Sequence, residues 1–207
     1  MSQLAIDEST LLSERRIGAL LRWVQENAGV PGVVFPFLAS TAGTALLPGE
    51  AARLRVHDVT LPEEGFGEVR VRAGEGRSVP LTPDLVGVLR GWIDQAGLKP
   101  GDLLFPGERG GPLPSSVYRK AWKQACEAVL SGEEREAGVG ERVAILRESC
   151  LDLWLKAGVP VWVVAEWAGL SASWLAQRYP HRFRVEDVEL DWEHLTKVMA
   201  LPDSLNR

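Results

Sequence analysis

The chain has 207 residues, of which 45% are hydrophobic and 25% are charged, and its net charge is −5. A chain of this length and hydrophobic content can bury one core, and we expect one domain that spans residues 1–207. The acidic balance does not favour a dedicated nucleic-acid binder, for which a basic surplus is typical, although net charge leaves room for a local basic patch.

The cysteines and histidines do not indicate a metal site. Cys126 and Cys150 belong to no C-x-x-C or Cys/His ligand spacing, and the three histidines are scattered along the chain. We therefore expect reduced thiols, a cytoplasmic protein, no metal and no cofactor. Acidic residues at positions 7 and 8 interrupt the N-terminus, so the sequence predicts no signal peptide.

The first elements in chain order are predicted to be helices. Ser13 is a suitable N-cap for a helix with apolar residues at helical spacing and a stop near Gly29. Residues 27–49 carry no charge but contain three prolines, which favours a buried helix through about Leu47 over a membrane span. Pro48 is typical of the first turn of a short third helix.

A small sheet is expected next. The stretches 55–61, 67–72 and 77–81 alternate between apolar and polar residues and are separated by turn sequences. This pattern predicts a three-stranded antiparallel meander. Thr82 then opens a helix that ends at Gly97.

The rest of the chain is predicted to be helical, with a polar loop at 131–140. Ser115 or Ser116 is a suitable cap for the helix that follows the Pro/Gly-rich connection. Further helical patterns cover 141–158, 160–169, 171–179 and 185–200. The predicted fold class is α+β, mostly α-helical, with one small antiparallel sheet.

Five phrases in this order resemble the catalytic domain of tyrosine recombinases, the phage-integrase family. "TALLPGEAARLRVHDV" is similar to the family's T-G-φ-R-x-x-E-φ-x-x-L-x-W-x-D-φ segment, where φ is apolar. "VRAGEGRSVPLTPDL" resembles its basic hairpin, and "LLFPGERGGPLPSSVYRKAWKQA" resembles its LF loop and basic helix. "ILRESCLDLWLKAGVPVWVVAEWAG" resembles its H-x-L-R-H-T helix and the phrase after it, and "AGLSASWLAQRYPH" resembles its tyrosine helix.

The likeness runs from about residue 12 to residue 181, and it implies the family's domain plan for this chain. Residues 182–207 are expected to form a C-terminal helical tail, and the family's N-terminal DNA-clamping domain is expected to be absent. In the family, the C-terminal helix often docks onto a neighbouring subunit. This implies a homo-oligomer, unless the tail folds back on its own domain. The apolar stripe that would dock consists of Val188, Leu190, Trp192, Leu195 and Val198.

The resemblance also implies a chemistry, which is transfer of a DNA phosphoryl group to tyrosine without a metal. Positive groups stabilise the transition-state phosphate, and an acid protonates the leaving oxygen. Tyr179 matches the nucleophile and Arg147 matches the second arginine. Apolar residues stand at the positions of the first arginine, the first histidine and the last histidine, namely Leu47, Ala144 and Leu170. We therefore expect no strand cleavage.

Two further catalytic positions are altered in charge or in acidity. Arg72 stands at or near the hairpin lysine, and a guanidinium with a pKa above about 12 is a poor proton donor. Glu148 replaces a histidine, and a carboxylate there repels phosphate. Without these groups, a tyrosine with an ordinary pKa of about 10 lacks the help it needs to ionise.

Two functional hypotheses follow, and each predicts a different partner. The first is an accessory protein of recombination or genome maintenance that contacts double-stranded DNA weakly through its phosphates. The predicted DNA contacts are Arg72, Arg77, Arg119, Lys120, Lys123 and Arg147. The alternative is a protein-interaction or oligomerisation module whose partner is an active recombinase or a second copy. An active recombinase with rearranged residues is the least favoured hypothesis.

Each candidate residue also has a structural interpretation. Tyr179 could simply close a helix before Pro180, and Arg147 could form an ion pair with Glu148 or Asp152. The basic helix could be a solvated face over a buried aromatic stripe, and the tryptophans are typical of a core or an interface.

Overall fold

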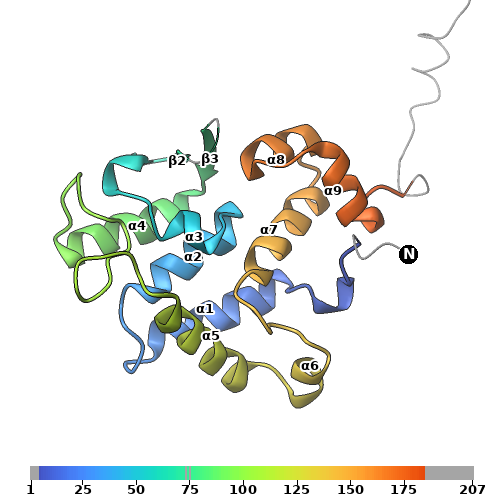
Figure 1. Ribbon diagram of the computed structural model, residues 1–207, viewed down its shortest axis with the longest axis horizontal. Helices are drawn as coiled ribbons and strands as arrows, with labels where there is room; N and C mark the ends of the chain where they lie inside the picture. Colours follow the sequence, from blue (N-terminus) through green and yellow to red (C-terminus); the bar gives the residue numbers. More distant parts are fainter. Residues whose placement is uncertain (1–4, 73, 75, 185–207) are drawn as a thin grey trace, which may run out of the picture.

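The computed structural model describes residues 5–72, 74 and 76–184, and the fold of this part is mostly helical (Figure 1). Its three strands are β1 (Val59–Thr60), β2 (Gly67–Val71) and β3 (Arg77–Leu81). The helices are α1 (Glu14–Glu26), α2 (Val34–Thr44), α3 (Pro48–Ala51), α4 (Pro83–Ala96), α5 (Ser115–Val129), α6 (Gly132–Glu136), α7 (Ile145–Lys156), α8 (Val161–Ala168) and α9 (Ala172–Arg178). Short 3-10 turns lie at Glu8–Thr10, Val56–Asp58 and Pro180–Arg182. The predicted α+β class with a small antiparallel sheet is confirmed.

Local capping chemistry explains why several predicted helices begin and end where they do. The hydroxyl of Ser13 accepts the Arg16 N–H, and the hydroxyl of Thr82 accepts the Leu85 N–H, so α1 and α4 start at their predicted caps. Gly97 ends α4 with φ +63°, a left-handed conformation that favours glycine.

Two predicted boundaries in the first half of the chain are wrong. The second helix ends at Thr44 rather than near Leu47, because Ala45 adopts the left-handed conformation with φ +50°. The first strand is shorter than the predicted 55–61. The Asp58 carboxylate accepts the Arg55 N–H and holds the residues before Val59 in a 3-10 turn.

Two predictions in the second half also need correction. Neither Ser115 nor Ser116 caps α5, because Pro114 occupies the cap position and Ser115 is already helical. The predicted polar loop at 131–140 contains the helix α6. In its capping box, the Ser131 hydroxyl accepts a hydrogen bond from the Glu134 N–H, and the Glu134 carboxylate accepts one from the Ser131 N–H.

The sheet has the order β1-β2-β3, and both pairs of strands are antiparallel. Val69 of β2 lies opposite Val59 of β1 and opposite Val79 of β3. Val69 and Val79 are buried, as are Val71 and Leu81, so alternate residues of the central and last strands face the core. The sheet lies beside α8, and α5 and α6 lie at the other end of the molecule (Figure 1).

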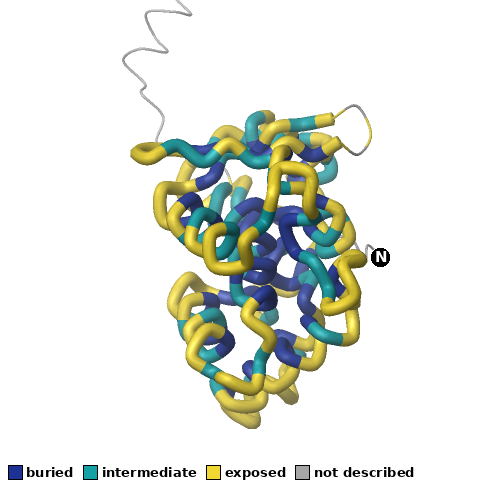
Figure 2. The backbone as a smooth tube through the Cα atoms, turned by 90° about the vertical axis from the view of Figure 1, so that its left-hand side faces the viewer, coloured by how far each residue is buried: buried dark blue, intermediate teal, exposed yellow. Residues whose placement is uncertain are grey.

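The centre of the core is α2, which packs against α1, α4, α5 and α7. Phe37 and Leu38 on α2 are completely buried, which confirms the prediction of a buried helix in the uncharged run. The Phe37 ring stacks on Tyr118 at a centroid distance of 4.7 Å and meets Phe105 edge-on at 5.4 Å. Buried backbone gathers in the interior, and exposed backbone covers the outside (Figure 2).

The tryptophans fall into different environments. Trp122 of α5 is buried, and the Trp154 and Trp167 rings meet edge-on at 5.4 Å. Trp162 differs, because 67% of it is exposed on α8. The predicted C-terminal helical tail, with its apolar stripe, lies outside the described residues.

Candidate functional site

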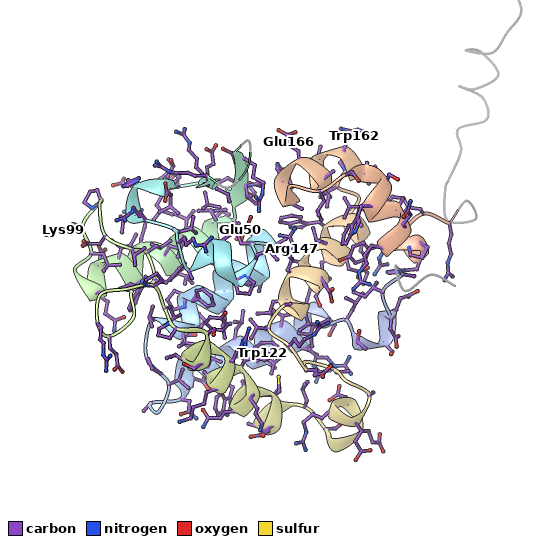
Figure 3. All side chains as sticks on the ribbon, in the orientation of Figure 1. Glu50, Lys99, Trp122, Arg147, Trp162 and Glu166 are labelled. Atoms are coloured by element: carbon purple, nitrogen blue, oxygen red, sulfur yellow. The ribbon has the colours of Figure 1, made fainter. Side chains whose placement is uncertain are left out.

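A cleft with a volume of about 1120 Å³ lies between residues 47–53, α5 and the segment 135–144. Leu47 and Ala144, two of the three apolar residues at predicted catalytic positions, line this cleft. Leu47 is 48% exposed, so an apolar side chain meets solvent where the resemblance places an arginine. Figure 3 shows Glu50 and Arg147 side by side, and Trp122 on α5.

Arg147 is buried near the start of α7, and protein atoms meet its charge. One guanidinium nitrogen donates to the carbonyl of Ala45, and the other donates to the carbonyl of Ala168 at 2.9 Å. The Glu50 carboxylate lies 4.0 Å from Arg147 Nη1. Burial lowers the pKa of Arg147, and the nearby Glu50 charge opposes that shift.

Glu50 and Arg77 form the best-defined ion pair of the site. The Arg77 Nη1 and Nη2 atoms donate to the two Glu50 oxygens at 2.9 and 2.8 Å, and Arg77 Nε donates to the Trp167 carbonyl at 2.8 Å. Burial raises the pKa of Glu50. The Arg77 and Leu47 N–H hydrogen bonds and the two guanidinium charges outweigh burial and hold that pKa below its ordinary value.

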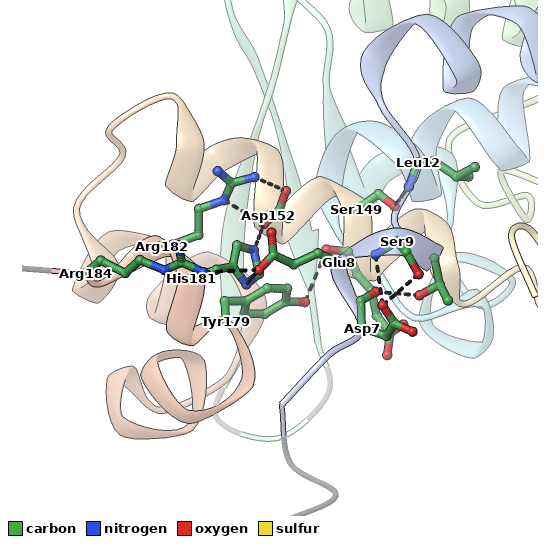
Figure 4. A network of polar contacts seen from close by, with 12 residues as sticks. Asp7, Glu8, Ser9, Leu12, Ser149, Asp152, Tyr179, His181, Arg182 and Arg184 are labelled. Atoms are coloured by element: carbon green, nitrogen blue, oxygen red, sulfur yellow. Dashed lines mark hydrogen bonds and ion pairs between the residues drawn. The ribbon is translucent and has the colours of Figure 1, made fainter. Parts of the chain in front are cut away.

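Tyr179, the predicted match to the nucleophile, is completely buried at the end of α9. Its hydroxyl donates to the main-chain carbonyl of Glu148 at 3.2 Å (Figure 4). Burial raises the pKa of Tyr179 above its ordinary value, and the Glu148 charge adds to the increase. A buried neutral phenol is a poor nucleophile, because the phenolate is the reactive form.

The acids next to Arg147 in sequence pair with other residues. Glu148 accepts from Arg178 at 2.7 Å. Asp152 receives both Arg182 Nε and Nη2, at 2.7 and 2.6 Å, and lies 2.7 Å from His181 Nε2 (Figure 4). The ion pair that the sequence suggested for Arg147 with Glu148 or Asp152 is therefore wrong, and Glu50 takes that place.

Leu170 lies apart from the cleft, in the connection between α8 and α9. It is half-buried and packs against the core, and its N–H donates to the Ala165 carbonyl at 2.9 Å. The preceding Gly169 has φ +65° and lies against the Arg77 side chain. The structure therefore brings Leu47, Arg147 and Ala144 to one region, while Leu170 contributes an apolar contact.

The remaining predicted DNA contacts are exposed cations on two elements. Arg119, Lys120 and Lys123 are exposed on α5, and Lys123 is 3.7 Å from Glu127. Arg72, at the end of the hairpin, keeps 72% of its side chain exposed although its Nε donates to Asp58 Oδ1 at 2.7 Å. On the same helix as the three cations, α5, Tyr118 and Trp122 are buried. They form the buried aromatic stripe that the structural interpretation of the basic helix predicted.

Sequence reasoning missed several residues that shape the site. No site role was predicted for Glu50, although it matches the acidic position of the motif "TALLPGEAARL" and so could have been recognised. Arg53 and Arg142 also line the cleft, from the two sides of the core, and no local pattern distinguishes them from surface arginines.

Comparison with known proteins identifies the family. The model of the phage integrase family matches residues 37–185, which include Leu47, Arg147 and Tyr179. The chain belongs to the phage integrase family. A comparison with curated protein sequences gave no match.

Solved structures of site-specific recombinases share the fold. XerH recombinase bound to its difH substrate superposes with a TM-score of 0.66 at 18% identity, covering 93% of this chain and 54% of the XerH chain. The Tn1549 transposon integrase in complex with circular intermediate DNA gives 0.66 at 13% identity, covering 94% of this chain and 67% of that chain. The catalytic domain of bacteriophage HP1 integrase gives 0.58 at 17% identity, covering 94% and 96%. The chain thus has the fold of this catalytic domain and spans about half of the XerH length.

Within residues 5–72, 74 and 76–184, no group of three or more His, Cys, Asp or Glu side chains is placed to hold a metal ion. No helix in the same ranges has the length and apolar character needed to cross a membrane.

Proposed function

We propose that this phage-integrase-family chain is a cytoplasmic, DNA-associated accessory protein of recombination or genome maintenance that does not itself cleave DNA. The observation that carries the proposal is the burial of Tyr179, whose hydroxyl is bound to a main-chain carbonyl while its surroundings raise its pKa. Strand cleavage requires a tyrosine that is exposed and activated beside a phosphate, and Tyr179 is neither exposed nor activated.

The side chains at the altered catalytic positions support the same conclusion. Leu47, Ala144 and Leu170 supply no hydrogen-bond donor from their side chains. Removing one preorganised donor from such a site typically costs about 10²–10³ in rate, although losses within one unit are not additive. The two best-placed cations, Arg77 and Arg147, already share the Glu50 carboxylate.

The exposed cations support a weak, backbone-type contact with duplex DNA. Arg119, Lys120 and Lys123 present three charges along one helix face, and Arg72 adds a fourth on the hairpin. Such contacts release counterions and carry little sequence information. The related XerH and Tn1549 structures contain DNA, which favours DNA as the partner here. Phosphate contacts by Arg77 and Arg147 would require Glu50 to give up its ion pairs.

The test of inactivity is incubation with a nicked duplex that traps a covalent protein–DNA adduct. We expect no adduct with the full chain over a range of pH. The Tyr179→Phe variant is the matched control, because it removes only the phenolic hydroxyl. An adduct that forms with the full chain and disappears in Tyr179→Phe would show an active recombinase.

The test of DNA association is a mobility shift with duplex DNA across a salt series. We expect binding at low salt that weakens steeply as salt rises, because phosphate contacts displace counterions. The alternative function, a protein-interaction or oligomerisation module, predicts no binding even at the lowest salt. That result would remove DNA association from the proposal.

A further inference from the structure

Three arginines surround the cleft from three separate segments. Arg53 follows α3, Arg119 lies on α5 and Arg142 precedes α7, and all three are exposed and line the same cavity. In the described part of the chain, none of the three forms an ion pair with a carboxylate. Guanidinium groups that line one cavity without an acidic partner favour an anionic ligand, and their planar donors fit a carboxylate or a phosphate in a bidentate manner.

The charge of the cleft is opposite to that of the whole chain. Its lining contains five cationic residues and three carboxylates, while the whole chain has a net charge of −5. The cations are Arg53, Arg119, Lys123, Arg135 and Arg142. Two of the carboxylates have cationic neighbours, because Glu50 pairs with Arg77 and Glu127 lies 3.7 Å from Lys123. The cleft therefore complements an acidic occupant.

The wall of the cleft that begins at Leu47 is apolar. Leu47 is 48% exposed and lines the cavity with the half-buried Ala144 and with Val139 and Val143, which are themselves buried. An exposed leucine beside several cations offers an apolar contact to an amphipathic ligand that also carries negative charge. A leucine or similar side chain of a peptide covers Leu47 with more apolar surface than the deoxyribose groups of a DNA backbone offer.

A hydrogen bond fixes two walls of the cleft relative to each other. The indole nitrogen of the buried Trp122 donates to the Gly140 carbonyl at 2.7 Å and fixes the segment 135–144 against α5. The volume of about 1120 Å³ exceeds the roughly 300–1000 Å³ of small-molecule pockets. A preformed cleft of this size accommodates several side chains of one peptide.

We propose that this groove, between Leu47 and α5, binds an acidic amphipathic segment of a partner protein. An apolar side chain of the partner packs against Leu47 and Ala144, and flanking carboxylates pair with Arg53, Arg119 and Arg142. This proposal goes beyond DNA association and does not depend on it. Because Arg119 and Lys123 belong to both surfaces, bound peptide and bound duplex compete for the chain.

The experiment uses the full chain and a fluorescein-labelled synthetic peptide with leucines on one helical face and aspartates and glutamates on the other. A second peptide carries lysine at every acidic position. Fluorescence anisotropy should show saturable binding of the acidic peptide and at least about tenfold weaker binding of the basic one. Equal binding of both peptides would overturn the proposal.

Two variants locate the peptide in the groove, and each has a matched control. Leu47→Asp and Arg142→Glu should each weaken peptide binding at least about tenfold, because each removes a central contact. Phe66→Asp and Arg109→Glu change residues exposed outside the groove and should leave binding unchanged. Peptide binding that survives both groove variants would overturn the assignment.

The remaining arms separate this proposal from DNA association and from other occupants. Lys120 is exposed on α5 but does not line the groove, so Lys120→Glu should weaken duplex binding and leave peptide binding intact. A chain that binds duplex but no acidic peptide would overturn only the groove proposal. A synthetic peptide of residues 185–207 could also bind the groove more tightly than the acidic peptide does. That result would assign the groove to the chain's own tail and overturn the proposal of a partner protein.

Discussion

Arg77 on β3 holds the carboxylate of Glu50 on α3 in a bidentate ion pair, with both N–O distances below 3 Å. The Arg77 side chain is only 10% exposed, and its third nitrogen donates to the Trp167 carbonyl. One carboxylate thereby joins the hairpin to α3 and lies close to Arg147 of α7. The predicted DNA-contact residue Arg77 is part of the internal framework of the site.

The first prediction concerns acid stability. The hydrogen bonds and guanidinium charges hold the pKa of Glu50 below its ordinary value, so the unfolded chain binds more protons in acid. The stabilisation is full above the ordinary carboxyl pKa of about 4.3 and is lost as pH falls through the lower folded pKa. Glu50→Gln should cost about 3 kcal/mol in the free energy of unfolding at neutral pH, because two buried cations lose their counter-charge.

The measurement is urea unfolding of both chains from neutral pH down to about pH 3. The difference between the two chains should be constant in the neutral range and should shrink in acid. Glu68→Gln is the control, because Glu68 pairs with Arg70 on the exposed face of the sheet and contributes about 1 kcal/mol or less. A Glu50→Gln difference that stays constant down to pH 3 would contradict this explanation.

The second prediction concerns Tyr179. If this residue is structural, Tyr179→Phe loses one hydrogen bond to the Glu148 carbonyl and costs about 1 kcal/mol of stability. Tyr179→Ala leaves a cavity in a fully buried site and should cost about 3–5 kcal/mol. Duplex affinity should be the same for Tyr179→Phe and the natural chain. A large loss of duplex affinity in Tyr179→Phe at unchanged stability would indicate a direct role at DNA.

The third prediction concerns the exposed cations of α5. Alanine at Arg119, Lys120 or Lys123 should each reduce the slope of log affinity against log salt by about 1, uniformly across DNA sequences. Arg109→Ala, an exposed arginine in the Pro/Gly-rich connection, is the matched control and should leave the slope unchanged. Mobility shifts at four or more salt concentrations give the slopes. If Arg109→Ala reduced the slope as much as the α5 substitutions do, the chain would attract DNA diffusely and would not bind it through a defined surface on α5.

Features that depend on neighbours in sequence were predictable. Ser13 and Thr82 start their helices because a hydroxyl can reach an N–H three residues later, and this requires no knowledge of the fold. The helix α6 was predictable in the same way. Ser131 and Glu134 have capping-box spacing, and the surrounding glycines and charges led to a loop prediction instead.

Features that depend on tertiary contacts were not predictable. Glu50 and Arg77 are 27 residues apart, so no local pattern connects them. The burial of Tyr179 depends on its packing against α7, and the sequence left a nucleophile and a helix-closing residue as alternatives. For Arg147, the acids adjacent in sequence were the natural partners to expect, yet the fold brings Glu50 to it from a separate helix.

The last prediction compares two glycines of the segment 135–144. Gly138 and Gly140 both adopt left-handed conformations, with φ +82° and +74°. A Cβ on Gly138 would meet nothing within 4 Å, whereas a Cβ on Gly140 would lie 2.8 Å from the Cys126 sulfur and 3.0 Å from Leu130 Cδ1. Gly138→Ala should therefore cost about 1 kcal/mol from backbone strain alone. Gly140→Ala should cost about 3 kcal/mol, because overpacking against buried side chains adds to the same strain.

Urea unfolding of the two variants separates strain from packing, because the backbone conformation is matched. Gly140 also accepts the Trp122 indole hydrogen bond, so displacement of this wall should disturb the groove as well as the core. We expect Gly140→Ala to weaken acidic-peptide binding and Gly138→Ala to leave it unchanged. Equal unfolding free energies for the two variants would mean that α5 and the segment 135–144 do not pack as closely as the 2.8 Å approach requires.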